Sequence, residues 1–187
     1  GEIFNYKELI HLEQLECKTK SDSEVLIRLY QKYGFNFLNK LNGMFAFCIY
    51  DIKKELYFCA RDRYRKKPFF YYFKNNKFIF SSSLKSILNL LDSKPNLNKV
   101  ALCKYMQYFV PFGEDTFYQD VFKLEASTYM IYEPNKPQEL QKKKYYKINT
   151  YKAIKDEKQA LNDIEELLVK SVEYRLNSDV EVASLLS

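Results

Sequence analysis

The arrangement of short apolar runs along the chain constrains its fold more than any other feature. Residues 44–51 form one such run and residues 55–61 a second, with a short polar turn between them. Residues 69–73 and 77–80 form another pair, separated by Asn75-Asn76. Runs of this length around short polar turns predict β-hairpins. Because apolar residues occur on both sides of each predicted strand, we expect sheets that are covered on both faces.

Helix signals surround these strands. Ser21 followed by Glu24 predicts a capping box, in which each side chain binds a free backbone amide at the start of a helix. Gly34 is expected to end that helix as a C-terminal cap. Apolar periodicity predicts further helices at residues 36–41, 83–91, 98–109 and 156–176. The last of these helices has one apolar face, formed by Leu161, Ile164, Leu168 and Val172.

The remaining segments predict two strands and a linker. Residues 128–132 read as a strand, residues 134–144 as a polar, lysine-rich surface linker, and residues 179–186 as a buried strand. The chain opens at Gly1 without a leader and closes inside an apolar run, so both ends are interpreted as cuts.

Composition excludes several classes of protein. Of the 187 residues, 47% are hydrophobic and 29% are charged, which is typical of globular and not of disordered chains. No apolar run approaches the roughly 18 residues that span a bilayer, and no secretory signal is visible, so we expect no membrane partner and a cytoplasmic protein.

The net charge of +6, concentrated at residues 61–67 and 141–147, keeps a non-catalytic basic binding module open as an alternative. Because no nucleic-acid motif accompanies it, and because the 17 Tyr and 15 Phe are explained by core packing, we expect no nucleic-acid partner. The four cysteines form no metal-binding or disulfide pattern with the single histidine; Cys48 and Cys59 are interpreted as small buried hydrophobes.

Four stretches, taken in order, resemble the asparagine synthetase family of class II (N-terminal nucleophile) glutamine amidotransferases. Gly1-Glu2-Ile3-Phe4-Asn5-Tyr6 is similar to the family's Asn-Gly-Glu-Ile-Tyr-Asn-Tyr without its first Asn, and Ser21-Asp22-Ser23-Glu24-Val25 to its Ser-Asp-Thr-Glu-Val. Residues 42–47, with 60–63 and 67–68, resemble its central hairpin. Residues 175–180 and 185–187 resemble the run into its Ser-Gly-Gly-Leu-Asp-Ser ATP loop, so the resemblance covers essentially the whole chain.

This resemblance implies an α+β fold in two parts. Residues 1–145 would form a glutaminase domain, an N-terminally truncated Ntn-hydrolase sandwich of α-β-β-α layers. Residues 150–187 would begin an α/β ATP-binding domain of the PP-loop pyrophosphatase type.

The resemblance also implies a glutamine site. In the family an N-terminal cysteine attacks the glutamine amide, and fixed N–H donors stabilise the oxyanion. The backbone N–H of Gly1 would be one donor, while Glu2 and Asp22 would hold the substrate, Asp22 through its α-ammonium group. The nucleophile lies upstream of Gly1, so the chain alone is not expected to hydrolyse glutamine. Taken singly, these residues could equally be a turn glycine, a solvated acid and a helix N-terminal charge.

For the second domain, the resemblance implies ATP binding, with Leu185 beside the adenine and Ser187 near the phosphates. A plain buried strand is the alternative. Ligands for Mg²⁺ and the aspartate site would lie beyond Ser187. The implied reaction converts aspartate, glutamine and ATP to asparagine, glutamate, AMP and pyrophosphate; a homodimer is left open.

Two residues depart from the family pattern. Arg65 stands where the family usually has Gly, and at a positive φ it would cost about 1 kcal/mol or more. Ser83 replaces the family's usual Glu. Both departures keep open a related amidotransferase that amidates another carboxylate, such as a sugar acid in surface-polysaccharide synthesis.

Overall fold

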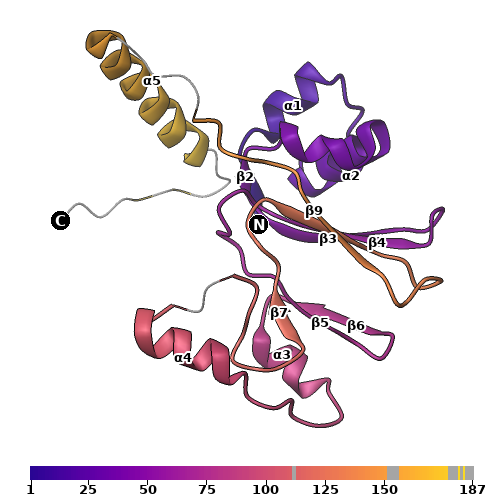
Figure 1. The fold of residues 1–187 in the computed structure, drawn as a ribbon. Helices are drawn as coiled ribbons and strands as arrows, with labels where there is room; N and C mark the ends of the chain where they lie inside the picture. The colour runs from indigo at the N-terminus through magenta and orange to yellow at the C-terminus, as the bar shows by residue number, and fades with distance from the viewer. Residues whose placement is uncertain (111–112, 151–155, 177–180, 182, 184–187) are drawn as a thin grey trace.

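The computed structural model describes residues 1–110, 113–150, 156–176, 181 and 183. Two antiparallel sheets lie one above the other, with helices on both outer sides (Figure 1). The four-stranded sheet, in the order β3-β4-β8-β9, consists of Ala46–Asp51, Leu56–Arg61, Thr128–Tyr132 and Leu140–Lys144. The three-stranded sheet, in the order β6-β5-β7, consists of Lys77–Ser81, Phe70–Lys74 and Val121–Lys123. A small separate pair joins β1 (Glu2–Ile3) to β2 (Gly43–Met44).

The helices form the outer layers of this sandwich. On the four-stranded sheet lie α1 (Tyr6–Leu12), α2 (Asp22–Tyr33) and the 3₁₀ helix η1 (Gly34–Lys40). Beyond the three-stranded sheet lie α3 (Leu84–Asn89) and α4 (Lys99–Tyr108) (Figure 1). The described residues therefore form α-β-β-α layers, as expected for the first domain.

Strand β4 shows why both faces of its sheet had to be apolar. Phe58 and Ala60 pack into the core beneath α2 and η1, while Cys59 between them packs into the core shared with the other sheet. All three side chains are fully buried. Since neighbouring side chains of a strand point to opposite faces, a strand between two cores reads as a continuous apolar run.

The predicted hairpins are confirmed. Cys48 of β3 pairs with Cys59 of β4, and Phe73 of β5 pairs with Phe78 of β6. The second hairpin turns at Asn75-Asn76, and both residues have positive φ, which fits a type I′ turn. Gly34 ends α2 at φ 56°, as predicted for a helix cap.

The capping-box prediction is half wrong. Ser21 does cap α2, because its Oγ accepts a hydrogen bond from the Ser23 N–H at 3.2 Å. Glu24, however, accepts hydrogen bonds from the backbone N–H groups of Lys18 at 2.9 Å and Thr19 at 2.7 Å. Led by the Lys18 bond, these contacts lower the pKa of Glu24 from 4.5 to about 2. The Glu24 carboxylate thus stabilises the turn before the helix and does not bind the Ser21 N–H, as a capping box would require.

The linker prediction for residues 134–144 is wrong over its second half. Leu140–Lys144 forms β9, which pairs with the whole length of β8. It is an edge strand, and four of its five side chains are exposed. Lysines on such an edge discourage pairing with other chains, and they also give the strand the composition of a loop. The segment predicted as a short helix at residues 36–41 is the 3₁₀ helix η1, which begins at Gly34.

The predicted long helix is α5 (Glu157–Arg175), which points away from the sandwich (Figure 1). Its last turn contacts the start of the chain: Tyr174 donates a hydrogen bond to Glu8 at 2.8 Å, and the Arg175 guanidinium lies 5.0 Å from the centre of the Phe4 ring. The predicted strand at residues 179–186 lies outside the described residues. Within the described part of the chain, no helix is both long and apolar enough to cross a bilayer.

Candidate functional site

The first three residues are fixed against the segment that precedes β3. Glu2 pairs with Met44 and Ile3 with Gly43 in the short β1–β2 ladder. The Phe4 N–H extends this contact by donating to the Asn42 carbonyl at 2.8 Å. The Ile3 side chain is buried in the core, whereas Gly1 is exposed and Glu2 half-buried. The segment is therefore anchored on one side and open to solvent on the other.

Asp22 is brought to this segment from 19 residues away. As the first residue of α2, it accepts a hydrogen bond through Oδ2 from the Ile3 N–H at 3.0 Å. Its Oδ1 accepts from the Ser23 hydroxyl at 3.4 Å. An ionised carboxylate has about four acceptor positions, so Asp22 keeps capacity for a further donor. The structure thus places Gly1, Glu2 and Asp22 in one neighbourhood, and Asp22 is more than a charge at a helix start.

Asn5 is a further residue of this neighbourhood that sequence reasoning missed. Its Oδ1 accepts from the Asn42 N–H at 2.9 Å, and its Nδ2 donates to the Lys40 carbonyl at 3.0 Å. The side chain holds residues 40–42 against the end of β1. Asn5 and Asn42 both lie in stretches matched separately to the family, but only the fold shows that these stretches face one another.

Behind the site, the buried pair Arg61 and Asp62 organises the loop that follows β4. The Asp62 carboxylate accepts three backbone N–H bonds of 2.9–3.0 Å, from Tyr64, Lys66 and Lys67. The Asp62 N–H donates to the Phe45 carbonyl at 2.9 Å, one residue after β2. Burial lowers the pKa of Arg61 to about 10, and its guanidinium donates to the carbonyls of Lys67 and Leu124. These partners give the pair a supporting role.

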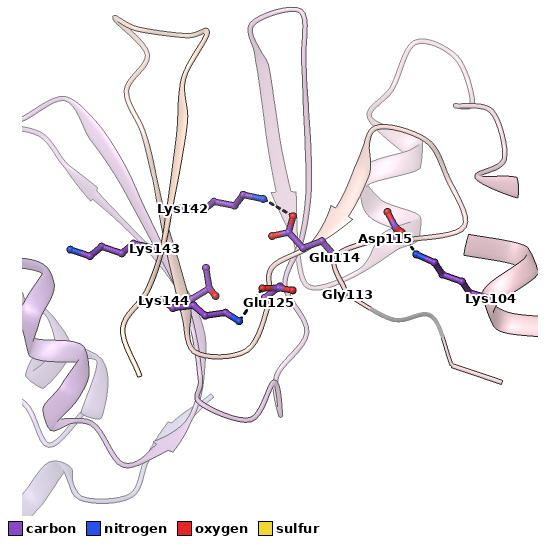
Figure 2. Close-up of a pocket in the computed structure, with 9 residues that line it drawn as sticks. Lys104, Gly113, Glu114, Asp115, Glu125, Lys142, Lys143 and Lys144 are labelled. Atoms are coloured by element: carbon purple, nitrogen blue, oxygen red, sulfur yellow. Dashed lines mark hydrogen bonds and ion pairs between the residues drawn. The ribbon is translucent and has the colours of Figure 1, made fainter. Parts of the chain in front are cut away.

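A separate cavity of about 610 Å³ opens beside β9 (Figure 2). Four lysines and three carboxylates line it: Lys104, Lys142, Lys143, Lys144, Glu114, Asp115 and Glu125. Each carboxylate is already paired with a lysine, as the dashed lines in Figure 2 show. Such solvent-exposed pairs are weak and leave little net charge to attract a ligand. The cavity therefore does not compete with the Asp22 neighbourhood as the candidate site.

The residues expected to bind ATP, Leu185 and Ser187, lie outside the described residues. Among the residues that the structure does describe, no group of three or more His, Cys, Asp or Glu side chains could hold a metal ion.

Comparison with known proteins relates this geometry to one family. Residues 1–146 match the family model described as a glutamine amidotransferase domain. All of this chain aligns with 36% of a Methanocaldococcus jannaschii protein whose name assigns it provisionally as asparagine synthetase (glutamine-hydrolysing) 2, at 44% identity. All of it also aligns with 30% of asparagine synthetase (glutamine-hydrolysing) 1 of Bacillus subtilis, at 34% identity. The chain thus spans about a third of the length of these relatives.

Among solved structures, the glutamine phosphoribosylpyrophosphate amidotransferase of B. subtilis shares the fold. The similarity has a TM-score of 0.50 and covers 78% of this chain and 28% of that one, at 15% sequence identity. The layered sandwich and the match over residues 1–146 point to the same family. The chain belongs to the glutamine amidotransferase domain family.

Proposed function

We propose that this chain is the glutaminase part of a longer, glutamine-hydrolysing asparagine synthetase, and that glutamine binds at Gly1, Glu2 and Asp22. The observation that carries the proposal is the 3.0 Å hydrogen bond from the Ile3 N–H to Asp22 Oδ2. It joins two stretches that the sequence matched separately to the same family. The names of the M. jannaschii and B. subtilis relatives support the choice of reaction.

Each residue has a role that suits its chemistry. The Asp22 carboxylate has acceptor positions left for the α-ammonium group of glutamine, and a charge-assisted bond is roughly twice as strong as a neutral one. The Gly1 N–H would donate to the oxyanion that forms when a cysteine thiolate attacks the amide carbon. Glu2 would accept from the substrate beside it. The thiolate would come from a segment upstream of Gly1, and ammonia would leave as the amide bond breaks.

The second half of the reaction is proposed on the resemblance and on the relatives' names. Residues 150–187 would begin a PP-loop ATP-binding domain, with Leu185 and Ser187 at the nucleotide and Mg²⁺ ligands further along the protein. ATP would supply the activation of the aspartate carboxylate, and ammonia from the first site would displace AMP. Pyrophosphate would be the other product.

The glutamine site can be tested by comparing Asp22→Asn with Glu24→Gln in the full-length enzyme. Both variants remove one carboxylate charge from the first turn of α2. Asp22→Asn should lower kcat/KM for glutamine hydrolysis by about 10- to 100-fold, because a charged hydrogen bond contributes about 1.5–3 kcal/mol. Glu24→Gln should leave it within about 2-fold, because Glu24 bonds to Lys18 and Thr19 and makes no bond to the Glu2–Ile3 segment that Asp22 holds.

Synthesis from free ammonia is the internal control, because it bypasses the glutamine site. Both variants should retain it. Equal losses of glutamine hydrolysis in the two variants would mean that Asp22 is only a helix charge and would remove the assigned role.

A further inference from the structure

We infer that Gly43 is a positioning residue for the glutamine site. Its missing side chain lets β2 approach the Glu2–Ile3 backbone so closely that a Cβ atom on residue 43 would displace the Glu2 carbonyl, one residue from the Gly1 N–H that is the proposed oxyanion donor. The inference deepens the proposed function and rests on it. Nothing in the motif around residues 42–47 assigned a role to this glycine.

The approach of the two strands leaves no room for a side chain. A Cβ atom on Gly43 would lie 2.3 Å from the Glu2 carbonyl oxygen, 2.9 Å from the Ile3 Cα and 3.2 Å from the Glu2 carbonyl carbon. All three neighbours are backbone atoms, so no side-chain rotation relieves the clash. Ordinary contact begins near 3.4 Å, so the Glu2 carbonyl and residue 43 would have to separate by about 1 Å.

The surroundings determine which side must move. Leu41 and Phe45, on either side of the β2 segment, are 1% and 3% exposed, so this segment is held in the core. Asn5 also ties residues 40 and 42 in place through two hydrogen bonds. On the other side, Gly1 is exposed and Glu2 only half-buried. Ile3 is only 1% exposed and anchors its own end of β1, so the displacement should fall on Gly1 and Glu2, the residues proposed to bind substrate.

Gly1 makes the same kind of contact in the opposite direction. A Cβ atom on Gly1 would lie 3.0 Å from the Met44 carbonyl oxygen and 3.1 Å from the Phe45 Cα. The two glycines thus let the two backbones pack directly on one another.

The chain offers a matched control in Gly34. It adopts φ 56° and would have no atom within 4 Å of an added Cβ, so its glycine is required by backbone conformation alone. Gly43 shows the reverse: its φ is not positive, but there is no space beside it for a Cβ atom. Alanine at position 34 therefore strains the fold away from the site, whereas alanine at position 43 acts on the site itself.

The test compares Gly43→Ala and Gly34→Ala in the full-length enzyme. Three quantities are measured: kcat and KM for glutamine hydrolysis, the rate of asparagine formation from ammonia, and the midpoint of thermal unfolding. Because a misplacement of about 1 Å can cost about 100-fold in rate, Gly43→Ala should lower kcat for glutamine by about that factor. It should keep ammonia-dependent synthesis within about 2-fold. Gly34→Ala should lower the unfolding midpoint and keep both activities.

Three other results would contradict the inference or the proposed function. Unchanged glutamine hydrolysis in Gly43→Ala would show that the close approach does not position the site. Loss of both activities in Gly43→Ala would show a purely structural role and would also remove the inference. If the unmodified enzyme uses ammonia but hydrolyses no glutamine, the proposed function fails first, before the variants are compared.

Discussion

Arg65 stands at φ 59°, in the left-handed region where an L side chain is strained. The sequence comparison predicted strain here if residue 65 has a positive φ, because the family usually has Gly at this place. The structure confirms the positive φ. The loop is held there by Asp62, whose Oδ1 accepts the N–H groups of Tyr64 and Lys66. The Arg65 guanidinium donates a 3.3 Å hydrogen bond to the Gly113 carbonyl.

We expect Arg65→Gly to raise the free energy of unfolding by about 0.5–1 kcal/mol, since glycine adopts this conformation without a steric cost. Urea titration followed by circular dichroism measures the change. Arg65→Ala is the control: it removes the same hydrogen bond but keeps the strained backbone, so it should give no gain. If both variants have the same stability, the positive φ is not costly here.

Residues that act locally could be predicted from the sequence, and residues that act across the fold could not. Gly34 as a helix cap and Asn75-Asn76 as a turn follow from their own neighbours. The clash that excludes a side chain at Gly43 depends on a strand 40 residues earlier in the chain, so no local pattern contains it. The pairing of Asp22 with the Ile3 N–H likewise depends on the packing of α2.

Among the elements, α1 is joined to α2 and η1 by one carboxylate. Glu13 follows α1 and forms ion pairs with Lys40 at 2.8 Å and Lys32 at 3.3 Å, and it also accepts from the Tyr33 hydroxyl. Led by the Lys40 bond and then the Tyr33 bond, these contacts lower the pKa of Glu13 from 4.5 to about 2. These bonds hold the end of α1 against the end of α2 and the end of η1.

This lowered pKa predicts a pH dependence. A carboxylate whose pKa is lower in the folded chain stabilises the fold above its ordinary pKa and ceases to do so as the pH falls through the folded value. Stability should therefore decline between pH 4.5 and about 2, and Glu13→Gln should decline less over that window while being less stable at pH 7. Thermal unfolding at a series of pH values measures both. Parallel curves for the two proteins would contradict the assignment.

The elements themselves were predictable wherever burial shaped the sequence. Strands β3 and β4 are apolar because they lie between two cores, and strands β5 and β6 supply aromatic side chains to the second core. Both hairpins were predicted correctly. Strand β9 was missed because its lysines face solvent, so only its pairing with β8 identifies it as a strand. The Glu24 contacts were missed because a carboxylate near a helix start has several free amides within reach, and spacing alone does not select one.

At the scale of the whole molecule, the α-β-β-α sandwich agrees with the fold implied by the resemblance, and the second domain stays a prediction. Helix α5 is consistent with a second domain, because Leu161, Ile164, Leu168 and Val172 are all more than half exposed in the described structure. The domain boundary near residues 145–150 and the ATP contacts of Leu185 and Ser187 rest on the resemblance. They cannot be derived from the packing of the described residues.

We propose that this chain belongs to an enzyme that takes nitrogen from glutamine to make asparagine. The most direct measurement is the formation of asparagine and AMP by the full-length enzyme with glutamine and ATP, with aspartate present and with aspartate omitted. We expect both products to form together and only when aspartate is present. Glutamine hydrolysis without asparagine would contradict the choice of acceptor, and a folded enzyme that hydrolyses no glutamine would contradict the claim as a whole.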